Sequence, residues 1–278
     1  MFGKKTFKWT KSWVLITGAA SGIGEQTALD VAERGANLVI CDIDEQGLEG
    51  LRQRLESMGV RVIAQVVDVS DAAQMEAFAD RVHSQIDAVD VLINNAGVAV
   101  EGKMMEMTLE QWSWLMGINV WGVIHGCHYF VPKMQDAERG GHVVNIASLA
   151  GLIAAPPLGA YAMTKFAVVG LSEALERELE SQGIGVTAIC PGFIRTNIAR
   201  SMVMTQEKGR RREVFEKMLA SRPGPQRVSA AIIEAVEQKH SLRPVNPEAW
   251  LMYWSKRVSP GLTRRSARLL GKLAERMR

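Results

Sequence analysis

Short apolar runs alternate with amphipathic segments along most of the chain. Each run holds five or six residues and is rich in valine, isoleucine and leucine, which is typical of a buried strand. Each intervening segment repeats its apolar residues every three or four positions, as a helix does when one side packs on a core. The runs predict strands at 12–17, 37–41, 62–67, 89–93, 142–147 and 186–190. The segments predict helices at about 25–35, 46–59, 72–87, 109–135 and 161–182.

This alternation predicts the fold class. Strands joined through helices run parallel, and helices then cover both faces of the sheet, so we expect an α/β fold with a doubly wound parallel sheet. The chain has 278 residues and no linker rich in glycine, serine or proline, so we expect a single domain over 1–249. Ligands bind such sheets at the carboxyl ends of the strands. Unusual residues stand at those ends: Gly18, Asp42, Asp68, Asn95, Ser148 and Pro191.

A glycine-rich turn, TGAASGIG, follows the first predicted strand and opens a helix. Gly18 permits the tight turn, Gly22 lets backbone amides approach a pyrophosphate, and Gly24 allows close packing of the helix on the sheet. The N-terminus of the helix adds partial positive charge. The spacing G-x-x-x-G-x-G differs from the G-x-G-x-x-G of many dinucleotide enzymes, and any turn from strand to helix can use glycine. Because an acid ends the next strand, we expect a dinucleotide site here.

That acid, Asp42, bears on the choice of cofactor. It lies 18 residues beyond Gly24, near the offset at which a carboxylate hydrogen-bonds an adenosine ribose. A carboxylate there would repel a 2′-phosphate, and Ile43 follows where a basic residue would accompany such a phosphate. We therefore expect NAD in preference to NADP. The alternative is a solvated aspartate in a turn.

A serine, a tyrosine and a lysine are the candidate catalytic residues. Ser148 follows a predicted strand, and Tyr161 precedes Lys165 by four residues, which places phenol and amine on one face of a helix. A tyrosine has an ordinary pKa of about 10, and a nearby ammonium favours its phenolate form. The phenol would then exchange a proton with an alcohol or a carbonyl, while Ser148 hydrogen-bonds the same oxygen. The structural alternative is a helix start with an ordinary aromatic residue and a surface lysine.

Together these residues resemble the short-chain dehydrogenase/reductase family over roughly 12–200, which implies a Rossmann fold. Asn119, Ser148, Tyr161 and Lys165 match the catalytic tetrad of that family in order and spacing. TGAASGIG is similar to its cofactor loop, Asp68-Val69 to its adenine contact, Asn94-Asn95-Ala96-Gly97 to its NNAG element, and PGFIRT (191–196) to its P-G-x-x-x-T element. The cofactor-binding residues that this resemblance implies are Gly18, Ser21, Gly22, Ile23, Gly24, Asp42, Asp68, Val69, Asn95, Tyr161, Lys165, Ile194 and Thr196.

The resemblance also implies a role for each member of the tetrad. Tyr161 would donate or accept the proton, and Ser148 would position the substrate oxygen. Lys165 would lower the pKa of the tyrosine and hold the nicotinamide ribose. Asn119 would hold a water in the proton relay. Ile194 and Thr196 would grip the nicotinamide carboxamide.

These observations favour an oxidoreductase that transfers a hydride between NAD and a secondary alcohol or ketone. The substrate is expected to be bulky and apolar, because the C-terminal part looks more like the branch of the family that handles steroids, retinoids and other lipophilic alcohols. One alternative is an NADPH-linked reductase of small or polyketide-like ketones, against which Asp42 argues. Another is a catalytically silent dinucleotide-binding scaffold, which would have no need of proton-transfer groups. The resemblance implies a homodimer or homotetramer.

The composition also bears on the cellular compartment of the protein and on its binding partners. The cysteines Cys41, Cys127 and Cys190 lie scattered in apolar surroundings, which favours reduced thiols in the cytoplasm and indicates neither a disulfide framework nor a metal site. No apolar stretch reaches the length of a membrane span without a break. No recognised nucleic-acid module or basic aromatic groove is present, so we expect no nucleic-acid partner.

The two ends of the chain are basic. Residues 1–13 carry four lysines, and 250–278 carry eight lysines and arginines against one glutamate. The ends together carry twelve basic residues and one acid, a net charge of +11 in a chain of net charge +3, which leaves the residues between them at −8. We expect 250–278 to form a basic, amphipathic helical tail. It either contacts a membrane surface or docks on the acidic body. A substrate lid is expected at about 199–225, where methionines mix with charged residues.

Overall fold

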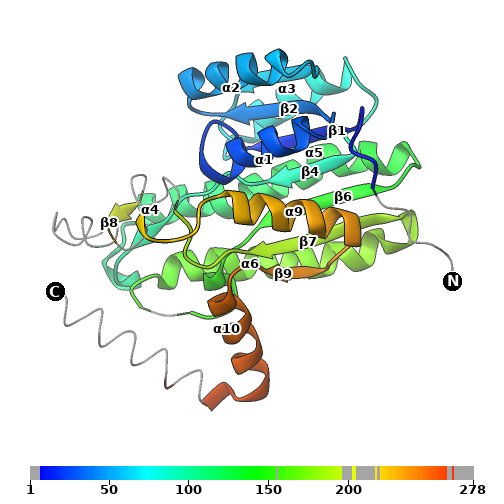
Figure 1. Ribbon diagram of the computed structural model, residues 1–278. Helices are drawn as coiled ribbons and strands as arrows, with labels where there is room; N and C mark the ends of the chain where they lie inside the picture. The colour runs from blue at the N-terminus through cyan, green and yellow to red at the C-terminus, as the bar shows by residue number, and fades with distance from the viewer. Residues whose placement is uncertain are drawn as a thin grey trace, which may run out of the picture.

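A computed structural model describes residues 7–154, 156–195, 202–204, 217, 220–261 and 265. The described residues form one seven-stranded sheet in the order β3-β2-β1-β4-β6-β7-β9, in which each neighbouring pair is parallel (Figure 1). Its strands are β1 (Trp13–Thr17), β2 (Asn37–Asp42), β3 (Val62–Val66), β4 (Val91–Asn94), β6 (Gly141–Ile146), β7 (Ile184–Cys190) and β9 (Leu242–Pro244). The strand order reverses between β1 and β4. This confirms the predicted α/β fold with a doubly wound parallel sheet.

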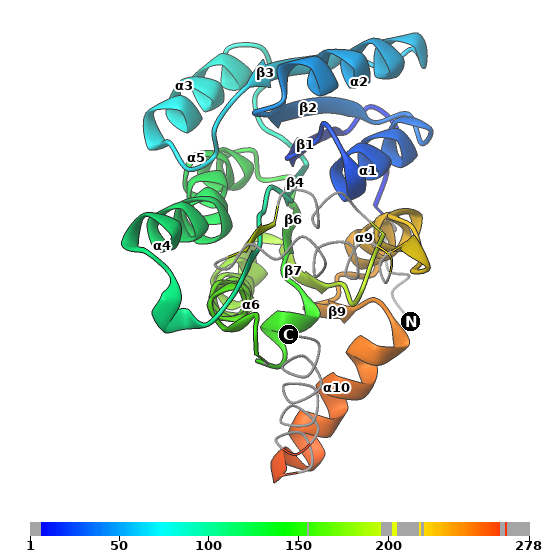
Figure 2. The ribbon, with the colours of Figure 1, turned by 90° about the vertical axis from the view of Figure 1, so that its left-hand side faces the viewer.

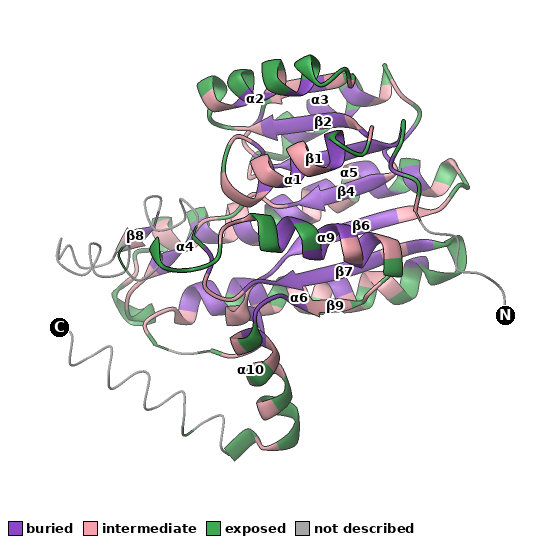
Figure 3. Ribbon diagram, viewed as in Figure 1, coloured by how far each residue is buried: buried purple, intermediate pink, exposed green. Residues whose placement is uncertain are grey.

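Helices cover both faces of the sheet (Figure 2). One face carries α1 (Gly22–Ala32), α2 (Glu45–Ser57) and α9 (Gln226–Gln238). The other carries α3 (Ala72–His83), α5 (Gly122–Asp136) and α6 (Gly159–Leu179). Side chains alternate between the two layers, so that Val14 and Ile16 of β1 join the first core while Leu15 joins the second. The central strands are therefore buried on both sides (Figure 3).

The long helix predicted at about 109–135 is continuous but irregular. It consists of α4 (Leu109–Met116), a π-helical segment, η2 (Gly117–Trp121), and α5. Glycines bracket the π-helical segment because the chain after β3 passes close by. A Cβ on Gly117 would lie 3.1 Å from the Cβ of Ser70, and one on Gly122 would lie 2.8 Å from a methyl of Val69. Such π-helical turns inside α-helices often mark functional sites, and this one carries Asn119.

Three short strands were not among those predicted. β9 adds an edge to the main sheet, while β5 (Val100–Glu101) and β8 (Val203–Met204) pair in parallel as a separate two-stranded ladder. β8 lies in the expected lid at about 199–225, most of which falls outside the described residues. All three strands are only two or three residues long, too short for a pattern to stand out.

The C-terminal part begins with α10 (Pro247–Val258), which projects from the β9 edge of the sheet (Figure 1). The boundary expected between 249 and 250 falls within this helix, and most of the expected tail beyond Gly261 lies outside the described residues. No helix in the described part of the chain is both long and apolar enough to span a bilayer. The three cysteines are free thiols, of which Cys41 and Cys190 are buried and Cys127 is half-buried.

Candidate active site

The predicted catalytic residues come from three elements that meet at the carboxyl edge of the sheet. Ser148 follows β6 and is the N-cap of the turn η3 (Leu149–Gly151), while Tyr161 and Lys165 lie in the first two turns of α6. Asn119 comes from the π-helical segment. Tyr161, Lys165 and Asn119 have exposed fractions of 8%, 4% and 0%, so their chemistry takes place out of bulk water.

The Ser148 hydroxyl lies close enough to the Tyr161 phenol to influence its pKa. Burial raises the pKa of the Tyr161 phenol, and the Ser148 hydroxyl opposes that shift. The Ser148 hydroxyl also accepts a hydrogen bond from the backbone of Ala150 at 3.1 Å, which fixes its orientation at the start of the turn. The two hydroxyls can therefore converge on one substrate oxygen.

Lys165 is held beside this pair by the backbone. Its Nζ donates to the carbonyl of Ile146 at 2.8 Å and lies 5.8 Å from the centre of the Tyr161 ring. Burial lowers the pKa of the Lys165 amine to about 8. The expected fall in the tyrosine pKa does not appear in this arrangement of protein groups, because desolvation of the phenol has the largest effect and raises its pKa.

The side-chain amide of Asn119 makes three hydrogen bonds to neighbouring protein groups. Its Oδ1 accepts from the backbone N–H of Val98 at 2.8 Å, and its Nδ2 donates to the Val98 carbonyl at 2.9 Å and to the Thr164 hydroxyl at 3.0 Å. Thr164 in turn donates to the carbonyl of Tyr161. The side chain of Asn119 thus ties the chain after β4 to α6, while its role toward a water in the proton relay stays a prediction.

Sequence reasoning missed several polar residues that support the site from within the core. Thr164 is one of them, although its place between Tyr161 and Lys165 is a signal that could have drawn attention to it. The others are Asn145 and Ser172, which form a buried chain with Asn94 of the NNAG element: Asn94 donates to Asn145 at 2.8 Å, and Asn145 donates to Ser172 at 3.0 Å. This chain ties β4, β6 and α6 together. No local sequence pattern predicts this chain of hydrogen bonds, because its bonded residues lie 27 and 51 positions apart.

The glycine turn is locked to the strand beside it. Gly18 and Gly22 have φ of 64° and 60°, which glycine adopts without strain. A Cβ on Gly24 would lie 2.2 Å from the Gly18 carbonyl oxygen, so this position has no room for a side chain. Asn95 donates from its amide to the carbonyls of Thr17 and Gly18 at 2.9 and 2.8 Å. Asn95 therefore shapes the turn through its side chain.

The N-terminus of α1 fits the phosphates of a dinucleotide. Its N-cap, Ser21, makes no side-chain hydrogen bond to the first turn among the described contacts, so the leading amides of the helix keep their donors. Those amides belong to Gly22, Ile23 and Gly24, and the dipole of the helix favours an anion in front of them. This matches the donor set that a pyrophosphate requires.

The Asp42 carboxylate lies beside the same turn. One of its oxygens accepts from the backbone N–H of Ala20 at 2.8 Å, and the other accepts from that of Asp44 at 3.0 Å. Two backbone donors thus fix a negative charge at the end of β2, next to the turn. This is the position at which the sequence predicted contact with a ribose.

Of the remaining predicted cofactor residues, the structure describes Asp68, Val69 and Ile194 but not Thr196. Asp68 accepts from the backbone and hydroxyl of Ser70, and the Val69 carbonyl bonds to Nδ1 of His125 at 2.8 Å. Ile194 is buried after β7, with an exposed fraction of 5%. Thr196 lies outside the described residues.

Apolar side chains surround Tyr161 on the side away from the sheet. The buried members of this cluster are Ala99, Val100, Leu115, Ala160, Tyr161 and Met202. Val98, Met107, Trp112, Ala150, Leu158 and Val203 pack against them. The ladder of β5 and β8 joins two sides of the cluster, and the backbone of Val203 donates to the Ala99 carbonyl at 3.0 Å. This apolar cluster beside the phenol is therefore drawn from segments that follow β4, β6 and β7.

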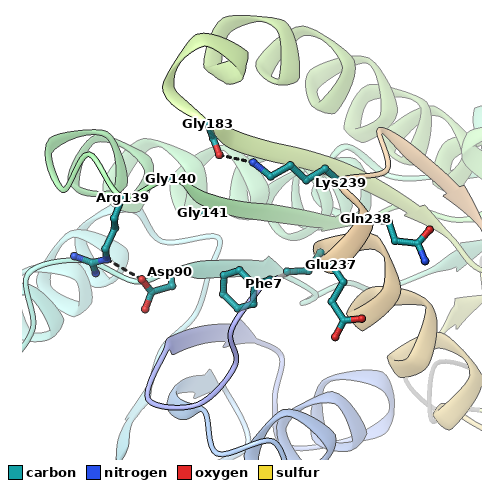
Figure 4. Close-up of a pocket in the computed structure, with 10 residues that line it drawn as sticks. Phe7, Asp90, Arg139, Gly140, Gly141, Gly183, Glu237, Gln238 and Lys239 are labelled. Atoms are coloured by element: carbon teal, nitrogen blue, oxygen red, sulfur yellow. Dashed lines mark hydrogen bonds and ion pairs between the residues drawn. The ribbon is translucent and has the colours of Figure 1, made fainter. Parts of the chain in front are cut away.

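A separate cavity of about 480 Å³ lies at the opposite edge of the sheet (Figure 4). The charged groups that line it have partners within the protein. Arg139 pairs with Asp90 at 2.8 Å, and Lys239 donates to the Gly183 carbonyl at 2.8 Å. Glu237 accepts from the indole of Trp9 at 2.8 Å. This cavity closes the amino ends of β6 and β7 and is remote from Tyr161.

Comparison with known proteins agrees with this geometry. The family model described as short chain dehydrogenase matches residues 12–207. The chain belongs to the short-chain dehydrogenase family. The predicted resemblance is thereby confirmed, and the described residues form the Rossmann-like fold of that family.

Relatives of this short-chain dehydrogenase differ in length and in cofactor. It is 40% identical over 264 residues to the probable oxidoreductase EphD of Mycobacterium tuberculosis, an alignment that covers 92% of this chain and 44% of EphD. The chain thus spans less than half the length of that relative. A short-chain dehydrogenase from Burkholderia phymatum in complex with NAD has a TM-score of 0.84 at 31% identity, with 92% and 96% of the two chains covered. One from Sphingobium yanoikuyae in complex with NADPH has a TM-score of 0.72 at 29% identity, with 84% and 87% covered. The family thus binds NAD or NADP, and both occur among the relatives.

Proposed function

We propose that the protein transfers a hydride between NAD and a secondary alcohol or ketone whose carbon skeleton is bulky and apolar. The observation that carries this proposal is the closeness of the Ser148 hydroxyl to the buried Tyr161 phenol, with the Lys165 amine buried beside them. Two hydroxyls and a buried cation in one dry site suit proton exchange with an oxygen that changes between alcohol and carbonyl.

Each residue has a role that follows from its surroundings. Tyr161 exchanges the proton with the substrate oxygen, and Ser148 holds that oxygen by a hydrogen bond. Lys165 contributes positive charge that favours the phenolate at the moment of transfer, and its amine would hold the nicotinamide ribose of a bound cofactor. Asn119 keeps the chain after β4 and α6 in register around them. When bound, NAD supplies the hydride acceptor or donor.

The choice of NAD over NADP follows from Asp42. Its carboxylate is fixed by two backbone donors beside the glycine turn, so it cannot swing away from an added phosphate without losing both hydrogen bonds. Repulsion between this carboxylate and a 2′-phosphate at an effective dielectric near 20 amounts to about 1–4 kcal/mol. An exposed Ile43 follows it and offers such a phosphate no counter-charge.

The apolar substrate follows from the cluster around Tyr161. The side chains of this cluster that pack beside the phenol are apolar and include thioethers and an indole. Burial of apolar substrate surface against such side chains contributes about 25 cal/mol per Å². A steroid-like or lipid-like alcohol fits this description better than a small polar one.

We include two further expectations in this proposal. The protein acts in the cytoplasm as a homodimer or homotetramer, in line with the resemblance. Its basic ends allow peripheral contact with an anionic membrane, from which a lipophilic substrate would be taken.

The test is a panel of secondary alcohols and ketones of increasing apolar size, assayed by nicotinamide absorbance with NAD(H) and with NADP(H). We expect catalytic efficiency to rise with apolar size and to be higher with NAD(H). Tyr161→Phe should lower turnover by a factor of about 10²–10⁴ while leaving cofactor affinity nearly unchanged. Higher efficiency with NADPH on small ketones would favour the reductase alternative, and cofactor binding without turnover on any substrate would favour the silent scaffold.

A further inference from the structure

Helix α10 lies outside the run of residues that resembles the family, yet its first turn contacts the cofactor side of the site. Glu248 accepts a hydrogen bond from the backbone N–H of Phe193 at 3.3 Å. A Cβ on Gly192 would lie 2.6 Å from the same carboxylate oxygen, so Glu248 rests directly on the chain that follows β7. The start of α10 is thereby anchored next to Ile194.

The last turn of α10 contacts the catalytic side of the site. Lys256 donates from Nζ to the carbonyl of Leu152 at 2.9 Å, across 104 positions of sequence. The same ammonium lies 4.2 Å from the centre of the Phe166 ring, and Phe166 is the neighbour of Lys165 in α6. A hydrogen bond from an ammonium is stronger than one between neutral groups, and its contact with a ring face adds to the attraction. Lys256 therefore joins two parts of the catalytic centre that the sheet does not connect.

Leu152 is the far end of the turn that begins at Ser148. Inside this turn Gly151 donates to the Ser148 carbonyl at 2.8 Å, and Leu152 donates to that of Leu149 at 2.9 Å. A Cβ on Gly151 would lie 2.7 Å from the Lys165 carbonyl, so the turn is pressed against α6. A short turn with these internal bonds moves as a unit. The hydrogen bond from Lys256 to the Leu152 carbonyl therefore also restricts the position of Ser148.

We propose that Lys256 is a positioning residue that fixes the Ser148 turn against α6 and so sets the distance between Ser148 and Tyr161. α10 acts as a clamp, with one contact at Glu248 in its first turn and the other at Lys256 in its last turn. The structural part of this proposal is that Lys256 restricts the motion of the turn from Ser148 to Leu152. Its catalytic part rests on the proposed function.

Four variants of the full chain test it. Lys256→Met keeps the aliphatic stem against Phe166 and removes the donor, while Lys256→Arg restores a donor. Arg257→Met is the matched control, because it removes a positive charge from the same turn of α10 at a side chain that stacks on Tyr253 of its own helix. Phe166→Leu, which removes the ring under the ammonium, is a second route to the same weakening.

The first readout needs no activity. Hydrogen–deuterium exchange of the amides of Ala150, Gly151 and Leu152 should become about tenfold faster in Lys256→Met, since a hydrogen bond to a charged group contributes roughly that factor. Exchange should remain at the wild-type rate in Arg257→Met and return to it in Lys256→Arg. Phe166→Leu should show a smaller increase. Unchanged exchange in Lys256→Met overturns the clamp.

The second readout is turnover. Lys256→Met should lower kcat about tenfold and leave the Kd for NAD unchanged, because the cofactor side keeps its anchor at Glu248. Faster exchange with wild-type kcat would show that Lys256 holds the turn without positioning Ser148, and it would overturn the catalytic part. If the wild-type protein turns over no alcohol or ketone, the proposed function fails, while the exchange experiment still decides whether the clamp exists.

Discussion

The buried Lys165 makes a testable prediction about stability and pH. Burial lowers the pKa of its amine from 10.5 in the unfolded chain to about 8 in the folded protein. Between these two values the unfolded chain binds the proton more tightly than the folded protein does. The free energy of unfolding therefore rises with pH across this range, by the linkage between proton binding and stability.

The magnitude follows from the size of the shift. One pKa unit corresponds to about 1.36 kcal/mol, so a fall from 10.5 to about 8 means that Lys165 destabilises the folded protein by roughly 3 kcal/mol at neutral pH. Most of this penalty disappears as the amine loses its proton. Between about pH 7 and about pH 9.5 the contribution of Lys165 to stability should improve by about 2 kcal/mol.

The assay compares two variants, Tyr161→Phe and Tyr161→Phe/Lys165→Met. The phenylalanine removes the ionisation of the neighbouring phenol from both, and methionine keeps the length of the lysine stem. Urea unfolding at about pH 7 and about pH 9.5 gives the free energy of unfolding of each. We expect the stability of the lysine-containing variant relative to the methionine variant to rise by about 2 kcal/mol. Lys133→Met, at an exposed lysine, is the control. A relative stability that does not change with pH would refute the reasoning.

Three other predictions concern separate parts of the molecule. Asp42→Ser should narrow the preference for NAD over NADP by removing a repulsion of about 1–4 kcal/mol; equal efficiency with both cofactors in the unchanged protein would contradict this. Asn119→Ala removes three hydrogen bonds in the core and should lower the free energy of unfolding by about 3 kcal/mol in urea titration, whereas a loss under 1 kcal/mol would mean that the clamp on Val98 is weak. Membrane contact predicts sedimentation with anionic but not neutral vesicles, weakened by salt and lost when residues after Ser259 are deleted. A full-length protein that stays in the supernatant with anionic vesicles at low salt would assign the tail a structural role.

The order of elements and the place of the site were predictable from sequence because both depend on local patterns. Five or six apolar residues in a row are enough to indicate a strand, and the residues that end those strands lie at one edge of a parallel sheet for topological reasons. Gly18, Asp42 and Ser148 could be assigned to that edge before any coordinate was known. The spacing of Tyr161 and Lys165 placed both on one face of a helix in the same way.

The contacts within the site were not predictable in the same way. The sequence suggested that Lys165 would lower the pKa of Tyr161, but burial of both groups decides the direction, and burial is a property of the packed protein. Likewise no local pattern indicates that the amide of Asn119 bonds to Val98 and Thr164. Strand β9 and the ladder of β5 with β8 escaped prediction because two or three residues carry no period.

The sequence by itself determined the alternation of strands and helices, the glycine turn and the acid after it, and the order of Asn119, Ser148, Tyr161 and Lys165. These are features of neighbouring residues, and steric and periodic rules act on neighbours. Only the tertiary structure decided that a lysine in the last turn of α10 reaches a carbonyl 104 positions earlier, or that a π-helical segment turns Asn119 onto the chain after β4. Such contacts depend on where whole elements come to rest against one another, and that is set by the packing of the entire core rather than by any local pattern.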